Sequence, residues 1–120
     1  MQVRLKLFAV ALVCFCIAPS VWAQDAVKVD PKHYKVEFEN DRVRVLRIKY
    51  GAGEKSVMHS HPESIAVFLT DAHGKFTYPD GKTEDINAKA GTVQHMDAHT
   101  HLPESRSKKP FEVIAVELKR

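Results

Sequence analysis

The residues of this sequence best suited to chemistry are its histidines, and five of the seven lie in two short clusters. The first cluster is His59 and His61, and the second is His95, His99 and His101. Residues two apart in a β-strand project from the same face, so a strand here would hold the imidazoles of His59 and His61 together. Neutral imidazole is a common metal ligand, and one or two histidines from a neighbouring strand complete a site of three or four ligands. The spacing therefore predicts a transition-metal site.

Each of these histidines also has a plainer interpretation. The first cluster could be an exposed polar pair, and His101 could make structural hydrogen bonds. His95 fits a fourth ligand, a hydrogen-bonding neighbour of the ligands or a half-buried strand residue, whereas the position of His99 favours a turn. His33 and His73 are predicted to be solvated, one at a strand edge and one in a turn. A short motif such as His-x-His occurs often by chance, so its spacing alone leaves these alternatives open.

The elements that must position the histidines are predicted to be short strands. Apolar residues alternate with polar ones through most of the sequence after Ala23, and no segment there keeps a helical period. Many short strands at regular spacing are typical of a sandwich or a barrel. The predicted strands cover residues 35–39, 42–50, 56–61, 64–70, 75–78, 82–88, 91–96, 101–106 and 111–118.

Several local features are predicted around these strands. Residues 24–31 form an extended arm, and Val36 and Phe38 lie on the buried side of a half-buried strand. The alternating pattern slips by one residue at Leu46, which indicates a β-bulge. Residues 71–74 form a turn, and residues 79–81 (Pro-Asp-Gly) form the tip of a hairpin.

The first 23 residues have the layout of a secretory signal peptide. Arg4 and Lys6 precede an apolar run that is too short to span a bilayer, and Ala23 ends a stretch typical of a cleavage site. We expect cleavage near Ala23 and a periplasmic or secreted domain of residues 24–120, with no membrane attachment afterwards. The alternative is a retained N-terminal anchor.

Removal of this leader changes the composition of the chain. Both cysteines, Cys14 and Cys16, would be lost, so the domain would have neither a disulfide nor a thiol nucleophile. Loss of Arg4 and Lys6 lowers the formal net charge from +3 to +1. No basic run interleaved with aromatic residues remains, which argues against nucleic-acid binding.

The spacing around the histidines resembles the motifs of the cupin family. Gly53 is followed after five residues by His59 and then His61, like the opening of the first cupin motif. Gly91, followed by residues 97–101, is similar to the second motif, with Asp97 where the family favours proline and His99 where it favours glycine. The resemblance covers residues 36–118. It implies a small antiparallel β-barrel (a double-stranded β-helix, or jelly roll) with a metal inside.

The resemblance also implies a set of ligands for a divalent transition metal. His59, His61 and His101 match the three metal-ligating histidines of the family. The family usually adds a carboxylate four or five residues after the second histidine, where this sequence has Ile65 and Ala66. Glu63 is near but shifted, so the further candidate ligands are Glu63, His95 and His99. Spacing does not distinguish iron, copper, nickel and zinc.

Three functions fit such a site. The resemblance implies a metal-dependent dioxygenase or isomerase acting on a small organic molecule. The alternatives are a non-catalytic small-molecule-binding protein and a periplasmic carrier of copper or nickel, because fold alone does not establish activity. A homodimer is also expected, both from the family resemblance and from the tendency of open strand edges to pair.

Overall fold

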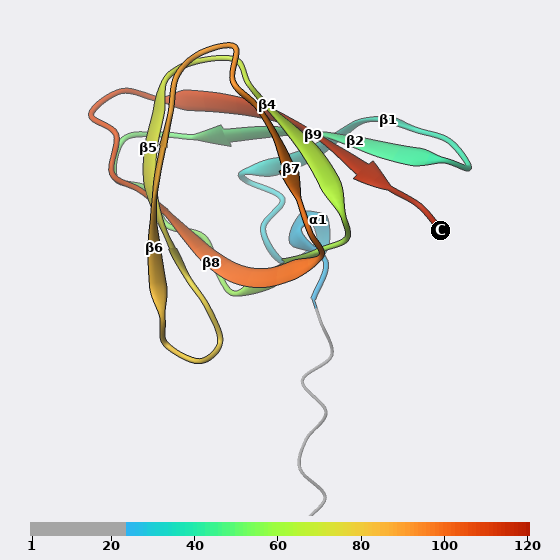
Figure 1. Ribbon diagram of the computed structural model, residues 1–120, viewed down its shortest axis with the longest axis horizontal. Coiled ribbons are helices and arrows are strands. Elements are labelled where there is room, and N and C mark those ends of the chain that lie inside the picture. Colours follow the sequence, from blue (N-terminus) through green and yellow to red (C-terminus); the bar gives the residue numbers. More distant parts are fainter. Residues whose placement is uncertain (1–23) are drawn as a thin grey trace, which may run out of the picture.

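The computed structural model describes residues 24–120, which form two antiparallel β-sheets and one helical turn (Figure 1). The larger sheet has the strand order β1-β2-β9-β4-β7, and the smaller one has the order β3-β8-β5-β6. The elements are α1 (Ala26–Val29), β1 (Tyr34–Glu39), β2 (Val43–Tyr50), β3 (His59–His61), β4 (Ser64–Phe68), β5 (Ala72–Thr77), β6 (Thr83–Ala88), β7 (Val93–Met96), β8 (His99–Ser105) and β9 (Phe111–Leu118).

The two sheets lie across from each other, and their facing sides enclose the interior of a small barrel (Figure 1). This confirms the prediction of an all-β barrel. β9 matches its predicted range of 111–118, and it lies between β2 and β4 at the centre of the larger sheet. Within residues 24–120, no helix is long and apolar enough to cross a membrane.

Strand alternation builds the core from both sheets. Along β9, every second residue from Phe111 to Glu117 points inward, and the register pairs these residues with the inward residues of β2 and β4. The buried apolar side chains form two clusters: Ala26, Tyr34, Leu46, Tyr50 and Ala115 in one, and Ala66, Phe68, Ala72, Ala88 and Val113 in the other. Small alanines opposite aromatic rings leave space inside the barrel.

The bulge predicted at Leu46 lies on the neighbouring strand, β1, opposite Val45 and Leu46. β2 pairs with β9 in one continuous register from Val43 to Tyr50. Arg44 therefore lies on the same inward face as Leu46, and the apparent slip arose because a charged residue occupies an inward position. The irregularity of the pairing lies in β1 instead, between Val36 and Phe38.

β1 is not the half-buried strand that its alternation predicts. Val36 is 44% exposed and Phe38 is 54% exposed. β1 is an edge strand of the larger sheet beside β2, and the β1–β2 hairpin extends away from the barrel (Figure 1). Tyr34, at the start of β1, is buried, but Val36 and Phe38 have no opposing sheet against which to pack.

Two further local predictions need correction, and one is confirmed. The expected arm at residues 24–31 contains α1, whose first turn is capped by Asp25 accepting a hydrogen bond from the Val27 amide at 2.8 Å. The expected turn at residues 71–74 belongs mainly to β5. The hairpin at residues 79–81 is confirmed: it joins β5 to β6, and Gly81 has a φ of 84°, which favours glycine. The predicted cleavage site at Ala23 lies outside the described residues.

Candidate metal centre

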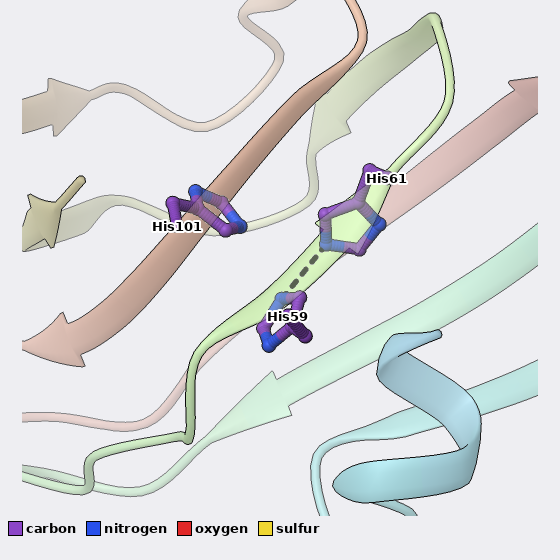
Figure 2. A group of neighbouring side chains, drawn as sticks. All are labelled: His59, His61 and His101. Atoms are coloured by element: carbon purple, nitrogen blue, oxygen red, sulfur yellow. Dashed lines mark hydrogen bonds between the residues drawn. The ribbon is translucent and has the colours of Figure 1, made fainter. Parts of the chain in front are cut away.

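Three histidines from two paired strands converge inside the barrel. β3 pairs with β8 so that His59 lies opposite His101 and His61 lies opposite His99. One ligand atom from each of His59, His61 and His101 lies within 4.8 Å of the others, and all three residues are buried. Figure 2 shows the rings of His59 and His61 on β3 and of His101 on β8 gathered around one space. The predicted same-face placement of His59 and His61 is therefore what the structure has.

Short β3 is held in place from both sides. On one side it pairs with β8, and the Ser60 hydroxyl lies 2.6 Å from the hydroxyl of Thr100. On the other side, the Ser60 amide donates to the carbonyl of Gln24 at 2.7 Å, and Asp25 forms an isolated bridge with Ser60. The backbone between the two histidines is thus fixed by the first described residues of the chain.

Hydrogen bonds fix the tautomers of the two β3 histidines. Nδ1 of His59 lies 2.8 Å from the carbonyl oxygen of Val57, and Nδ1 of His61 lies 3.0 Å from Oε2 of Glu117. Carbonyl and carboxylate oxygens only accept, so each Nδ1 carries the proton that it donates. In the neutral rings, each Nε2 is therefore unprotonated and carries a lone pair.

These two lone pairs face each other at close range. His59 Nε2 and His61 Nε2 are 2.9 Å apart, the contact drawn as a dashed line in Figure 2. Two unprotonated nitrogens at this distance repel unless a cation lies between them. Two metal–nitrogen bonds of about 2.0–2.1 Å place their nitrogens about 2.8–3.0 Å apart at a right angle and about 3.3–3.4 Å apart at the tetrahedral angle. The spacing fits two ligands of one metal ion.

His101 completes the group with two unsatisfied nitrogens. Neither Nδ1 nor Nε2 of this buried ring has a hydrogen-bond partner within residues 24–120. Buried polar atoms in folded proteins nearly always have a hydrogen-bond partner, and a bound ion is one explanation when they have none. Burial, followed by the neighbouring histidines, holds the pKa of His101 far below its usual range. Burial also lowers the pKa of His59 to about 4. Both rings are therefore neutral, as metal ligands must be.

Behind His61 lies a charged network that the sequence analysis missed. Glu117, on the inward face of β9, is 1% exposed. Its Oε2 accepts from His61, and its Oε1 accepts from Arg44 through Nε at 2.7 Å and Nη2 at 2.6 Å. Arg44 Nη2 also contacts Asp25 at 2.8 Å. Carboxylates in this position orient metal-bound histidines and raise their basicity. The sequence signal for this network was one charged residue, Arg44 or Glu117, at an inward position of each of two otherwise apolar strands.

His59 has a different polar neighbourhood. The Ser56 hydroxyl lies 3.4 Å from His59 Nδ1 and 2.5 Å from Asp30, a buried carboxylate that also accepts from the ring of His33 at 2.7 Å. Tyr34 packs edge-on against His59, with ring centroids 4.8 Å apart. His33 was predicted to be solvated, but it is buried. Its ring stacks on that of Tyr50, with ring centroids 4.2 Å apart.

His99 lies beside the three-histidine group rather than within it. Its ring centroid is 4.3 Å from that of His101, but its Nδ1 donates to the carbonyl of Asp97 at 2.7 Å. Its Nε2 is buried and has no partner in the described part of the chain. Burial lowers the pKa of His99, which favours the neutral ring. The residue begins β8, where the sequence favoured a turn.

The structure places Glu63 and His95 away from the histidine group, against each other. Glu63 Oε1 lies 2.9 Å from His95 Nε2, and its Oε2 accepts from Arg120 at 2.5 Å. His95 sits opposite Ile65 on the outward face of the larger sheet. Of the two positions where a cupin carboxylate was sought, Ile65 faces outward and Ala66 lines the interior. Glu117 is thus the carboxylate nearest to the three histidines by direct contact.

A small cavity opens next to the histidines. It offers about 80 Å³ to the centre of a water-sized sphere. Its lining includes His61, His99 and His101, and the other lining residues are mainly apolar residues of both sheets, such as Phe68, Phe76 and Val113. The metal centre therefore faces an apolar space with room for a small molecule.

No protein-family model matches the sequence, and no curated protein matches it. Solved structures do match. A cupin domain from Bordetella pertussis Tohama I is 20% identical, with a TM-score of 0.67 over 72% of this chain and 92% of that chain. The chain has the cupin fold. A cupin superfamily protein from Desulfitobacterium hafniense DCB-2 is 17% identical, with a TM-score of 0.55 over 72% of this chain and 76% of that one.

A third match extends over nearly the whole chain. An RmlC-like cupin from Desulfovibrio desulfuricans is 17% identical, with a TM-score of 0.50 over 98% of this chain and 96% of that one. At these identities the matches establish the fold, and the prediction of a cupin-type barrel is confirmed. The function of this cupin-fold protein must be argued from its own site.

Proposed function

We propose that this protein binds one divalent transition metal through His59, His61 and His101 and accepts a small organic molecule at that metal. The observation that carries the proposal is the 2.9 Å approach of two Nε2 lone pairs, since a shared cation removes their repulsion. His101, buried and without a hydrogen-bond partner among residues 24–120, supplies the third ligand.

The cavity favours a ligand-accepting site over a metal carrier. A carrier needs a saturated site, whereas the protein brings three ligand atoms together beside an apolar space. An open coordination position lets a bound metal act as a Lewis acid or bind oxygen. We therefore place dioxygenase or isomerase chemistry first among catalytic roles, with simple ligand binding as the alternative if no turnover is found.

The setting of this function is also a proposal. The leader-like residues 1–23 support export to the periplasm or beyond, with cleavage near Ala23. The exposed Phe38 and Val93, both on the larger sheet, support a homodimer in which this sheet is covered. N-terminal sequencing of the exported protein and light scattering of the purified domain test these two points.

Metal analysis of the untagged protein and one double variant tests the main proposal. We expect wild-type protein to hold about one equivalent of iron, copper, nickel or zinc after dialysis, and His59→Ala with His61→Ala to hold none while remaining folded. His73→Ala is the matched control, because it removes an exposed histidine from β5. Full metal content in the folded double variant would contradict the proposal. Oxygen uptake by the iron-loaded protein with small aromatic substrates then distinguishes catalysis from binding.

A further inference from the structure

One nitrogen in the cavity is not used by the metal centre. His99 Nε2 is buried, lacks a hydrogen-bond partner within residues 24–120, and belongs to a ring that lines the cavity. The hydrogen bond from its Nδ1 to the carbonyl of Asp97, 2.7 Å long, fixes which nitrogen carries the proton. His99 therefore holds an unpaired hydrogen-bond acceptor in the wall of the cavity.

The rest of the lining has little polarity. Among the described residues that line this cavity there is no lysine, arginine, aspartate or glutamate. Its two hydroxyl groups belong to Ser64 and Tyr34, and the Tyr34 hydroxyl is paired with that of Tyr50 at 2.7 Å. A charged group carried away from the histidine end would lose its hydration without gaining a counter-ion, which is costly. The walls thus select against zwitterions, dianions and sugars.

The three histidines of the cavity lining lie together. The ring centroid of His99 lies 4.3 Å from that of His101 and 5.5 Å from that of His61. A ligand that reaches the metal centre with its polar end therefore also reaches His99, and its body lies against apolar walls. The cavity holds on the order of five to eight water-sized positions at roughly 10–15 Å³ each, which suits a single ring.

We propose that the cavity takes a small, uncharged, mainly apolar molecule carrying one hydroxyl-type donor, and that His99 Nε2 determines specificity by accepting a hydrogen bond from that donor. The proposal rests on the proposed function for the metal that adjoins the polar end. His99 occupies the position where the second cupin motif favours glycine, so this acceptor belongs to this chain rather than to the motif.

Matched probe molecules test this without knowledge of the natural ligand. Phenol carries the donor, anisole replaces its hydrogen by a methyl group, and 4-hydroxybenzoate keeps the donor but adds a charge at the opposite end of the ring. Binding to zinc-loaded wild-type protein is measured by calorimetry or by protein NMR shifts. We expect phenol to bind about tenfold more tightly than anisole, the effect of one buried hydrogen bond, and 4-hydroxybenzoate to bind more weakly than phenol, because its carboxylate would lie against apolar walls.

The variant His99→Leu should bind phenol about tenfold more weakly and should no longer distinguish phenol from anisole. His99→Gln, which retains an acceptor, should recover part of the preference. Zinc content and thermal unfolding are measured for each variant, and the wild-type probe series needs no variant at all. Equal binding of phenol and anisole to wild type, tighter binding of 4-hydroxybenzoate than of phenol, or no phenol binding at millimolar concentration would overturn the proposal. Loss of zinc from folded His99→Leu would make His99 a ligand and would also overturn it.

The same measurements separate this inference from the proposed function. If wild type takes up zinc but does not prefer phenol, the inference fails and the metal site stands. If wild type takes up no metal but still prefers phenol and loses that preference in His99→Leu, the metal assignment fails and the ligand class stands.

Discussion

Two carboxylate–histidine pairs in this molecule have nearly the same geometry and very different surroundings. Glu117 and His61 are 3.0 Å apart, with side chains 2% and 7% exposed. Glu63 and His95 are 2.9 Å apart, with side chains 27% and 52% exposed. Each carboxylate also accepts from an arginine, Arg44 in the first pair and Arg120 in the second.

The difference in burial assigns different roles to the two pairs. In the buried pair, water cannot replace a lost partner, so Glu117 fixes the His61 tautomer and keeps Arg44 compensated. In the exposed pair, water and salt compete with the contact, and such pairs contribute about 0–1 kcal/mol. Sequence distance gives no hint of this, since Glu63 is only two residues from His61 and Glu117 is 56 residues away.

The largest expected effect comes from breaking the buried pair. Glu117→Ala leaves the buried His61 Nδ1 without its acceptor and leaves Arg44 paired with Asp25 alone, and we expect it to reduce the free energy of unfolding by about 3 kcal/mol. Glu63→Ala should cost less than about 1 kcal/mol. Chemical denaturation of the metal-free proteins measures both. Similar losses in the two variants would contradict the distinction between the pairs.

Acid should destabilise the metal-free protein through its buried histidines. The folded-state pKa of His59 is lowered from 6.5 to about 4, and that of His101 is lowered further, mainly by burial. Between pH 6.5 and pH 4, these histidines bind protons in the unfolded chain but not in the folded chain. The free energy of unfolding therefore falls as the pH falls from about 6.5 towards 4. His59 alone accounts for a loss on the order of 3 kcal/mol.

Unfolding midpoints measured across this pH range test the acid effect. A metal-free protein whose stability is flat between pH 6.5 and 4 would show that these rings are not held neutral by the fold. The variant His59→Phe should have a shallower pH dependence, because it removes one of the groups responsible. His73→Ala again serves as the control for removing an exposed histidine.

A smaller effect is expected when the buried pair is weakened rather than broken. Glu117→Gln retains an acceptor for His61 Nδ1–H but removes the negative charge, and we expect the affinity for zinc to fall about 10- to 100-fold. Glu63→Gln, the matched change in the exposed pair, should alter zinc affinity by less than about twofold. Competition with a chromophoric chelator gives both constants, and equal effects would mean that Glu117 does not act through His61.

The sequence predicted the parts of the site that depend on local spacing. A separation of two residues placed His59 and His61 on one face, the glycine spacing identified the cupin-type barrel, and the apolar run of β9 gave its boundaries. Each of these follows from strand periodicity or from a short motif, so a single segment contains the information.

The parts that sequence did not predict depend on pairing between distant segments. Arg44 was interpreted as one side of a slipped strand, because nothing near it shows that Glu117 lies across the register. Phe38 was expected to be buried because alternation does not reveal that β1 is an edge strand. The single turn of α1 is too short to show a helical period. The one sequence signal for this pairing was a charge at an inward position of each strand, Arg44 in β2 and Glu117 in β9.

The central claim is that three neutral imidazoles, and neither Glu63 nor His95, hold the metal. The most direct measurement is the X-ray absorption spectrum of the zinc-loaded, untagged protein, compared with that of the Glu63→Gln, His95→Ala double variant. We predict three imidazole nitrogens at about 2.0–2.1 Å from zinc, with the same spectrum in both proteins. A site with fewer than three imidazoles, or a nitrogen or oxygen shell that changes in the double variant, would contradict this account.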